Sequence, residues 1–217
     1  MQLASEIPYL AEAEIERRAE VMLASYEERW GEIDGPPVPV ERLVEVHLDL
    51  RILWKEIPEV GEHTILAYIR PSERTIVMNE AQLGHFERYL GTEVFTLGHE
   101  VGHWDLHVAK GSRQLSFGGE SEREFVCRWR EKDRREWQAD RYAAALLMPE
   151  ALVREAVAGL DLSLWRTLYR LKEAFAVSIM ALRIRLEELG LIYRVEGRRI
   201  FVREEDYERS KGQLVLG

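Results

Sequence analysis

The residues best suited to chemistry are two histidines four positions apart, His99 and His103, with Glu100 directly after the first. In a helix, side chains at this spacing lie on one face, so both imidazoles can bind one cation. Glu100 would project beside that cation, where its carboxylate can act as a general base toward water. The pattern predicts a catalytic metal site. Zn²⁺ is the first candidate ion, and Mn²⁺ is the second because ligand types narrow the metal only loosely.

A catalytic zinc site needs a third protein ligand. His107 continues the four-residue spacing, but it lies eight residues of helix, about 12 Å, from His99. Three histidines spread over that length cannot share one ion, so we expect His107 beside the site or in the core. Glu136 is a better candidate, because it opens a second predicted helix whose small residues would allow close packing. On spacing alone, however, an exposed acid at a helix N-terminus is the favoured interpretation of Glu136. Asp140, one turn later, could accept the N–H of a ligand histidine.

The hydrophobic pattern outlines the elements that must position these residues. Helical periodicity predicts helices over 15–30, 40–48, 93–108, 136–147, 163–175 and 177–189, with Thr92 and Ser163 as caps of the third and fifth. β-rich runs predict strands over 52–54, 65–69, 75–78, 124–129, 192–195 and 199–202, and 111–119 is expected to be loop. The strand at 75–79 is either a core strand or one that pairs with an extended substrate.

The mixture of helices and short strands predicts an α+β fold. Gly159 to Asp161 marks a plausible boundary, which divides the chain into a first domain, 1–160, and a second, 161–217. In the second domain, two helices followed by a hairpin resemble a small helix-turn-helix or winged-helix unit.

Composition excludes several function classes. The 217-residue chain has a net charge of −9, which disfavours general binding to nucleic acid. Residues 166–203 carry nine Lys and Arg against four Asp and Glu, either a basic face for DNA or an acidic partner, or an ordinary solvated helix surface. No apolar run is long enough to span a membrane. Cys127 is the only cysteine, and no secretory signal is recognisable, so a cytoplasmic location is expected.

The motifs together resemble those of the ImmA/IrrE metallopeptidase family. The resemblance covers roughly residues 10–195 and rests on four segments in the family's order, namely 75–79, 95–107, 136–149 and 175–191. It implies a zincin-like, gluzincin-type core with His99, His103 and Glu136 as zinc ligands. Glu100 would be the base. Characterised members are linked to site-specific cleavage of helix-turn-helix repressors, which makes such a repressor the expected protein substrate.

The chain departs from the family pattern at three places. Asp140 stands where the family usually has Asn. The stretch from Ala109 to Arg135 is long, and we expect it to shape the cleft or regulate access. The sequence also predicts a short form without the C-terminal sensor domain of some members.

Three questions stay open at this stage. The oxyanion donor is one of His107, Tyr142 and Tyr169, or another group. A different metal-dependent amidohydrolase uses the same helix pattern, although such enzymes commonly need a cysteine ligand in a separate motif. A transcription regulator with structural zinc, binding DNA or protein, is a third possibility, although a structural site normally has four protein ligands.

Overall fold

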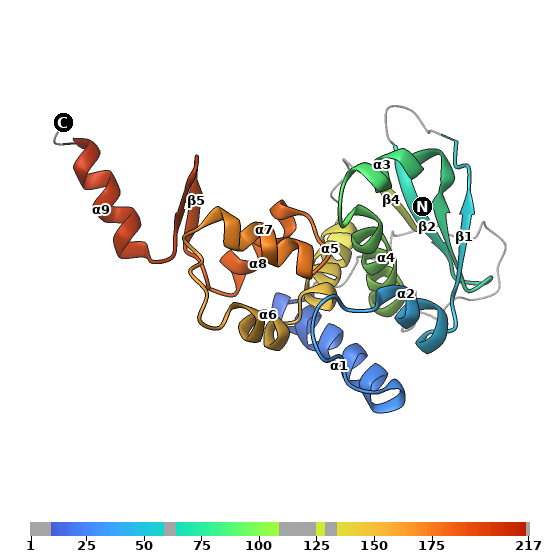
Figure 1. Cartoon of the computed structure of the whole chain (residues 1–217). Coiled ribbons are helices and arrows are strands. Elements are labelled where there is room, and N and C mark those ends of the chain that lie inside the picture. Colours follow the sequence, from blue (N-terminus) through green and yellow to red (C-terminus); the bar gives the residue numbers. More distant parts are fainter. Residues whose placement is uncertain (1–9, 59–63, 109–124, 129–133, 216–217) are drawn as a thin grey trace, which may run out of the picture.

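The computed structural model describes residues 10–58, 64–108, 125–128 and 134–215 (Figure 1). The helices are α1 (Glu12–Trp30), α2 (Val40–Arg42), α3 (Leu83–Arg88), α4 (Thr92–His103), α5 (Arg134–Leu147), α6 (Glu150–Val157), α7 (Trp165–Ala174), α8 (Ile179–Glu188) and α9 (Glu204–Val215). Shorter turns are η1 (Leu43–His47), η2 (Glu80–Gln82) and η3 (Trp104–Val108), of which η1 and η3 are π-helical. The strands are β1 (Arg51–Lys55), β2 (Ile65–Arg70), β3 (Thr75–Asn79), β4 (Phe125–Arg128), β5 (Arg194–Glu196) and β6 (Arg199–Phe201). The mixed α+β class predicted from the sequence is confirmed.

Strand β3 lies in the interior of the main sheet. The strand order is β1-β3-β2-β4, with β3 parallel to β1 and antiparallel to β2, and β2 antiparallel to β4. All five residues of β3 are buried. Both of its hydrogen-bonding edges are occupied, so the idea that residues 75–79 pair with a substrate is wrong, and the core-strand interpretation is correct. Alternating hydrophobicity could not separate the two, because an interior strand and a buried edge strand have the same composition.

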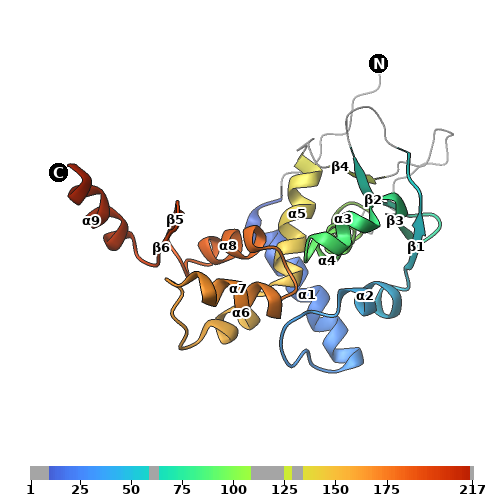
Figure 2. The same ribbon diagram turned by 45° about the horizontal axis from the view of Figure 1, so that its top comes forward.

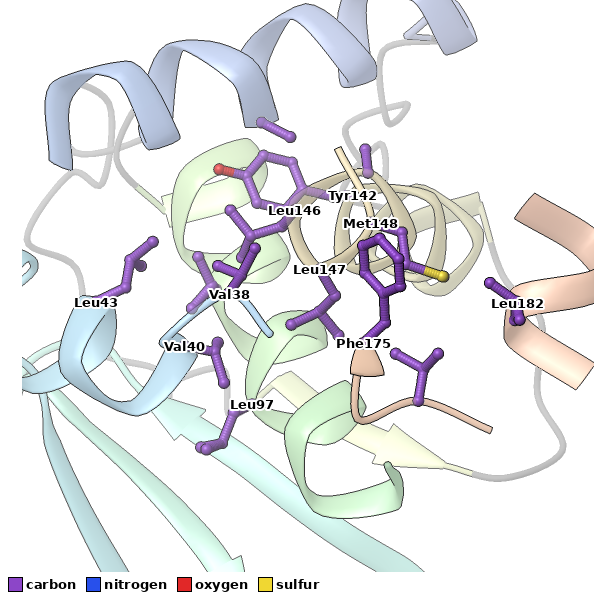
Figure 3. Packing of buried hydrophobic residues seen from close by; sticks show 14 of the residues in the cluster. Val38, Val40, Leu43, Leu97, Tyr142, Leu146, Leu147, Met148, Phe175 and Leu182 are labelled. Carbon is purple, nitrogen blue, oxygen red and sulfur yellow. The ribbon is translucent and has the colours of Figure 1, made fainter. Parts of the chain in front are cut away.

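Helices α4 and α5 lie between the sheet and the C-terminal helices in both views (Figures 1 and 2). Helix α4 packs against β2 and β4 on one side and against α5 on another, while α1 crosses α5. The core between them includes Leu97 of α4, Leu146 and Leu147 of α5 and Phe175 after α7 (Figure 3). The helix that carries the paired histidines is therefore held on several sides by packed apolar residues.

The C-terminal part contains the two helices and the hairpin that the sequence predicts. Helices α7 and α8 contact each other, and β5 pairs antiparallel with β6. The N-cap of α7 is Leu164 rather than the predicted Ser163, whose hydroxyl donates to Asp161 instead. The N-cap of α4 is Gly91, and the predicted cap Thr92 is the first helical residue. The division of the chain at residue 160 stays a prediction.

Three helices were not predicted, namely α3, α6 and α9. The first two are short, and α9 is rich in charged residues at its start, so none has a long apolar stripe. The segment predicted as loop, 111–119, lies outside the described residues. No helix in the described part of the chain is long and apolar enough to cross a membrane.

Candidate metal centre

His99, His103 and Glu136 converge on one point between α4 and α5. The two histidines present their Nε2 atoms to each other at 3.0 Å. Glu136 at the start of α5 places Oε2 3.2 Å from His99 Nε2 and Oε1 3.3 Å from His103 Nε2. The side chains of both histidines are at most 2% exposed, and that of Glu136 is 16% exposed. Glu136 is therefore not a solvated helix-terminal acid, the alternative that spacing left open.

The donor set fits a divalent metal ion. Four donor atoms are directed toward a common centre, and one ligand atom from each residue lies within 4.8 Å of the others. Tetrahedral zinc with bonds of 2.0–2.1 Å holds its ligand atoms roughly 3.3 Å apart, close to the separations found here. Two imidazole lone pairs facing each other repel unless a proton or a cation lies between them. These three residues form a possible metal site, and the identity of the metal stays a prediction.

Close approach of α4 and α5 makes this convergence possible. A Cβ added to Gly102 would lie 3.1 Å from the Cα and the carbonyl oxygen of Ala139, and one added to Gly98 would lie 3.4 Å from the Cβ of Ala143. Glycines four residues apart thus face alanines four residues apart across the helix pair. The small residues of the second helix play the packing role that the sequence suggested.

Asp140 fixes the orientation of His99. Its Oδ1 lies 2.9 Å from His99 Nδ1, on the side of the ring opposite the possible metal site. A carboxylate only accepts hydrogen bonds when ionised, so His99 Nδ1 carries the proton and donates it to Asp140. The Nε2 lone pair is then free for a metal. The departure from the family's Asn leaves this contact in place.

Glu100 is completely enclosed beside the three residues. It is 0% exposed, and neither of its carboxylate oxygens has a hydrogen-bond partner among the described residues. Burial, with a further contribution from the negative charge of Glu136, raises the pKa of Glu100 to about 8, against an opposing effect of His99. A buried carboxyl without a partner is costly, and such groups often mark functional sites.

Glu136 has the opposite electrostatic character. Burial alone would raise its pKa. In the metal-free protein, hydrogen bonds from protonated His103 and His99, together with the positive charges of those rings, lower the pKa to about 2. The two carboxyl groups of the site are therefore separated in acidity by their environments. Glu136 is ionised at neutral pH and can act as a ligand, whereas Glu100 holds or releases a proton near neutrality.

The three candidate oxyanion donors lie in different places. His107 is half-buried, and its ring centroid lies 5.4 Å from that of His103. Tyr142 is fully buried, and burial, followed by the charge of Asp105, raises its pKa well above the ordinary value. Tyr169 is exposed on α7 and packs against Trp165. The long stretch 109–135 lies mostly outside the described residues.

Sequence reasoning missed Arg18 of α1. Its guanidinium pairs with Asp105, which follows His103 by two residues. The two residues are 87 positions apart and neither belongs to a motif, so only an alignment of homologues carrying both could have linked them.

The part of the chain that carries these residues is similar to a known protein family. The model of the IrrE N-terminal-like domain, a peptidase family designated M78, matches residues 88–187, a range that includes α4, α5, α7 and nearly all of α8. No curated protein matches the chain. The matched range contains His99, Glu100, His103 and Glu136, the four residues of the site described above. The match over residues 88–187 supports the resemblance to the ImmA/IrrE family of metallopeptidases that the sequence motifs indicate.

Proposed function

We propose that this protein is a zinc-dependent endopeptidase that cleaves a helix-turn-helix transcriptional repressor at one site, in the cytoplasm. One observation carries the proposal, namely the convergence of His99, His103 and Glu136 beside the enclosed carboxyl group of Glu100. The peptidase domain match supports the reaction class. The repressor as substrate and the transcriptional role rest on the family resemblance.

His99, His103 and Glu136 would hold the zinc ion. When bound, zinc supplies a Lewis acid that acidifies water and polarises a peptide carbonyl. The remaining work falls to the side chains of the chain. Asp140 holds the His99 ring in the tautomer that leaves Nε2 unprotonated. Glu136, ionised at neutral pH, supplies the negative charge that a dication favours.

Glu100 would transfer the proton. Its raised pKa means that the carboxyl group is largely protonated near neutral pH while the neighbouring site holds no cation. A nearby positive charge favours the ionised form of a carboxyl group. With a cation held at the site, Glu100 would be ionised and would act as a base. It would take a proton from water as the water oxygen bonds to the peptide carbonyl carbon, and deliver that proton to the amine as the C–N bond breaks.

An extended substrate would pair with β4 in this proposal. Strands β1 and β4 form the two edges of the described sheet, and β4 is the edge strand that contacts α4. An edge strand offers unpaired backbone groups to a peptide. Because β4 lies next to the metal-binding helix, a peptide added there would run past the catalytic residues.

The exposed face of α8 supports a protein partner over DNA. In a helix-turn-helix unit, α8 would be the recognition helix, yet its exposed side chains include Met180 and Ile184, four residues apart. Arg183 is paired with Glu187, and Arg185 is buried against α1. A helix that reads DNA presents donors and cations to the groove, not an apolar pair. This observation also weighs against the DNA-binding regulator.

The deciding experiment combines metal content with cleavage. Wild type, Glu100→Gln and Glu93→Gln would be purified, analysed for metal and incubated with a helix-turn-helix repressor encoded by a neighbouring gene. Glu93→Gln is the same substitution on the same helix, seven residues before Glu100, and serves as the matched control. One zinc ion in all three proteins, with a single cut by wild type and Glu93→Gln only, is the expected result.

Other outcomes would contradict parts of the proposal or favour one of the alternative functions. Undiminished cleavage by Glu100→Gln would contradict its role as base. Hydrolysis of small amides without any cut in a protein would favour an amidohydrolase, and salt-sensitive DNA binding without proteolysis would favour a regulator. Absence of metal, even after zinc is supplied, would remove the metallopeptidase proposal.

A further inference from the structure

Arg18 is a buried cation on the first helix, outside the matched domain. Its side chain is 8% exposed, and that of its partner Asp105 is 19% exposed. The guanidinium makes an ion pair of 2.7 Å with Asp105 Oδ1 and also donates to the backbone carbonyl of Asp105. Arg18 therefore binds both the side chain and the main chain of Asp105. A buried cation is costly unless it is satisfied in this way.

Asp105 lies at the point where the metal-binding helix changes its geometry. Helix α4 is regular up to His103, and the π-helical turn η3 begins at Trp104. At the junction, the Trp104 N–H is shared between the carbonyls of Glu100 and Val101. A π-helical turn is rare and often accompanies functional sites. Because this N–H is shared between two acceptors, the hydrogen bonds of the helix fix the backbone after His103 only weakly. A contact from another element can then determine where this backbone lies.

We propose that Arg18 is a positioning residue for the metal centre, which anchors Asp105 so that His103 Nε2 is held opposite His99 and Glu136. The inference rests on the proposed function. His103 is two residues before Asp105. A shift of the Asp105 backbone therefore moves the Cα of His103, and with it the His103 ring. Because the ligand atoms stand only 3.0–3.3 Å apart, a displacement of about 1 Å matters for metal affinity.

Tyr142 of α5 lies close to the Arg18–Asp105 ion pair. Burial, followed by the charge of Asp105, raises the pKa of Tyr142 well above its ordinary value, so the group is a neutral phenol at physiological pH. Tyr142 is also packed against Gly102 of α4. Three elements, α1, α5 and η3, thus meet just after His103. Arg18 brings the positive charge to this meeting point.

The same helix offers a matched control. Glu16 of α1 pairs with Arg185 of α8, whose side chain is 3% exposed and whose Nε also donates to the Met148 carbonyl. This ion pair is as buried as that of Arg18 and anchors the same helix, but it faces α8 rather than α4. Loss of either pair should lower stability, whereas only loss of the Arg18 pair should alter the metal centre.

The experiment compares zinc affinity, measured by chelator competition below the melting temperature, across five proteins. These are wild type, Arg18→Met, Arg18→Lys, the double variant Arg18→Met with Asp105→Leu, and the control Arg185→Met. The double variant removes the buried charge along with its partner, so it folds even if Arg18→Met does not. A second readout needs no metal, namely the imidazole ¹⁵N resonances of His103 in the chelator-treated proteins.

We expect zinc affinity to fall roughly 10–100-fold in Arg18→Met and in the double variant, with partial recovery in Arg18→Lys. The His103 resonances should shift in the same proteins, and Arg185→Met should keep wild-type affinity and resonances. Wild-type affinity and resonances in the folded double variant would overturn the inference and leave Arg18 as a stabilising residue only. A wild type that binds zinc without cutting a repressor would count against the proposed function alone.

Discussion

Gly102 of α4 touches Ala139 of α5, and a Cβ at Gly102 would lie 3.1 Å from the Ala139 backbone. Ala139 is one turn after Glu136, so the closeness of this contact sets how far the Glu136 carboxylate reaches toward the histidines. The distance between the two helices at this single place therefore controls the geometry of the possible metal site.

Gly102→Ala should weaken zinc binding at least tenfold and lower stability by about 1–3 kcal/mol, because the added methyl group pushes α5 away. Zinc titration and urea unfolding measure the two effects. Gly84→Ala in α3 is the control, since a Cβ there meets nothing within 4 Å. It should leave zinc affinity unchanged and stabilise the protein slightly. Equal effects of the two substitutions would show that the contact at Gly102 is not critical.

Asp140→Ala should reduce zinc affinity roughly 10–100-fold, because His99 loses the acceptor that fixes its tautomer. Asp140→Asn retains a side-chain oxygen and should lose less. Competition titrations at constant pH provide the measurement. If both variants bind zinc as tightly as wild type, the hydrogen bond to His99 does not contribute to the site.

Glu100 should make the metal-free protein less stable as the pH rises. Its pKa is about 8 in the folded chain and 4.5 in the reference state. The folded chain therefore retains a proton that the unfolded chain releases, and unfolding free energy falls between about pH 4.5 and pH 8. Glu100→Gln removes this titration. Urea unfolding with chelator at pH 5, 6.5 and 8 should show a smaller decline in the variant, and parallel curves would contradict the raised pKa.

Gly91→Ala should be strongly destabilising. Gly91 has φ of +83°, and a Cβ there would lie 2.5 Å from the Val177 Cα. Strain at positive φ and a clash with the backbone before α8 would act together. Gly190→Ala shares the positive φ, at +65°, but has open space around it, so it should cost only about 1–2 kcal/mol. Thermal unfolding of both variants separates the two contributions, and equal losses would argue against the clash.

Local periodicity was sufficient to predict the helix of His99 and His103 and to place both rings on one face. The spacing rule works because helix geometry is fixed by the backbone alone. Glu136 needed more, since its role depends on how closely two helices pack, and only the glycine and alanine pattern indicated that. The family resemblance indicated Glu136, and the structure places its carboxylate oxygens 3.2 Å and 3.3 Å from the two Nε2 atoms, although its role as a ligand stays a prediction.

Long-range contacts could not be predicted in this way. Arg18 and Asp105 are joined by tertiary packing, and each is unremarkable in its own segment. The position of β3 between β1 and β2 also depends on strand order, which the composition of a strand does not reveal. Both failures concern the pairing of distant segments, where local propensity carries no information.

The distant ion pairs of the first helix affect when this helix can fold during synthesis. Glu16 is 169 residues from its partner Arg185, and Arg18 is 87 residues from Asp105. Helix α1 is made before both of these partners, so neither ion pair can form until the partner residue has been synthesised. Contacts of such separation are made late and slow folding. The two ion pairs of α1 therefore cannot both form until residue 185 has been made, so the first helix reaches its final set of contacts only after α8 has been synthesised.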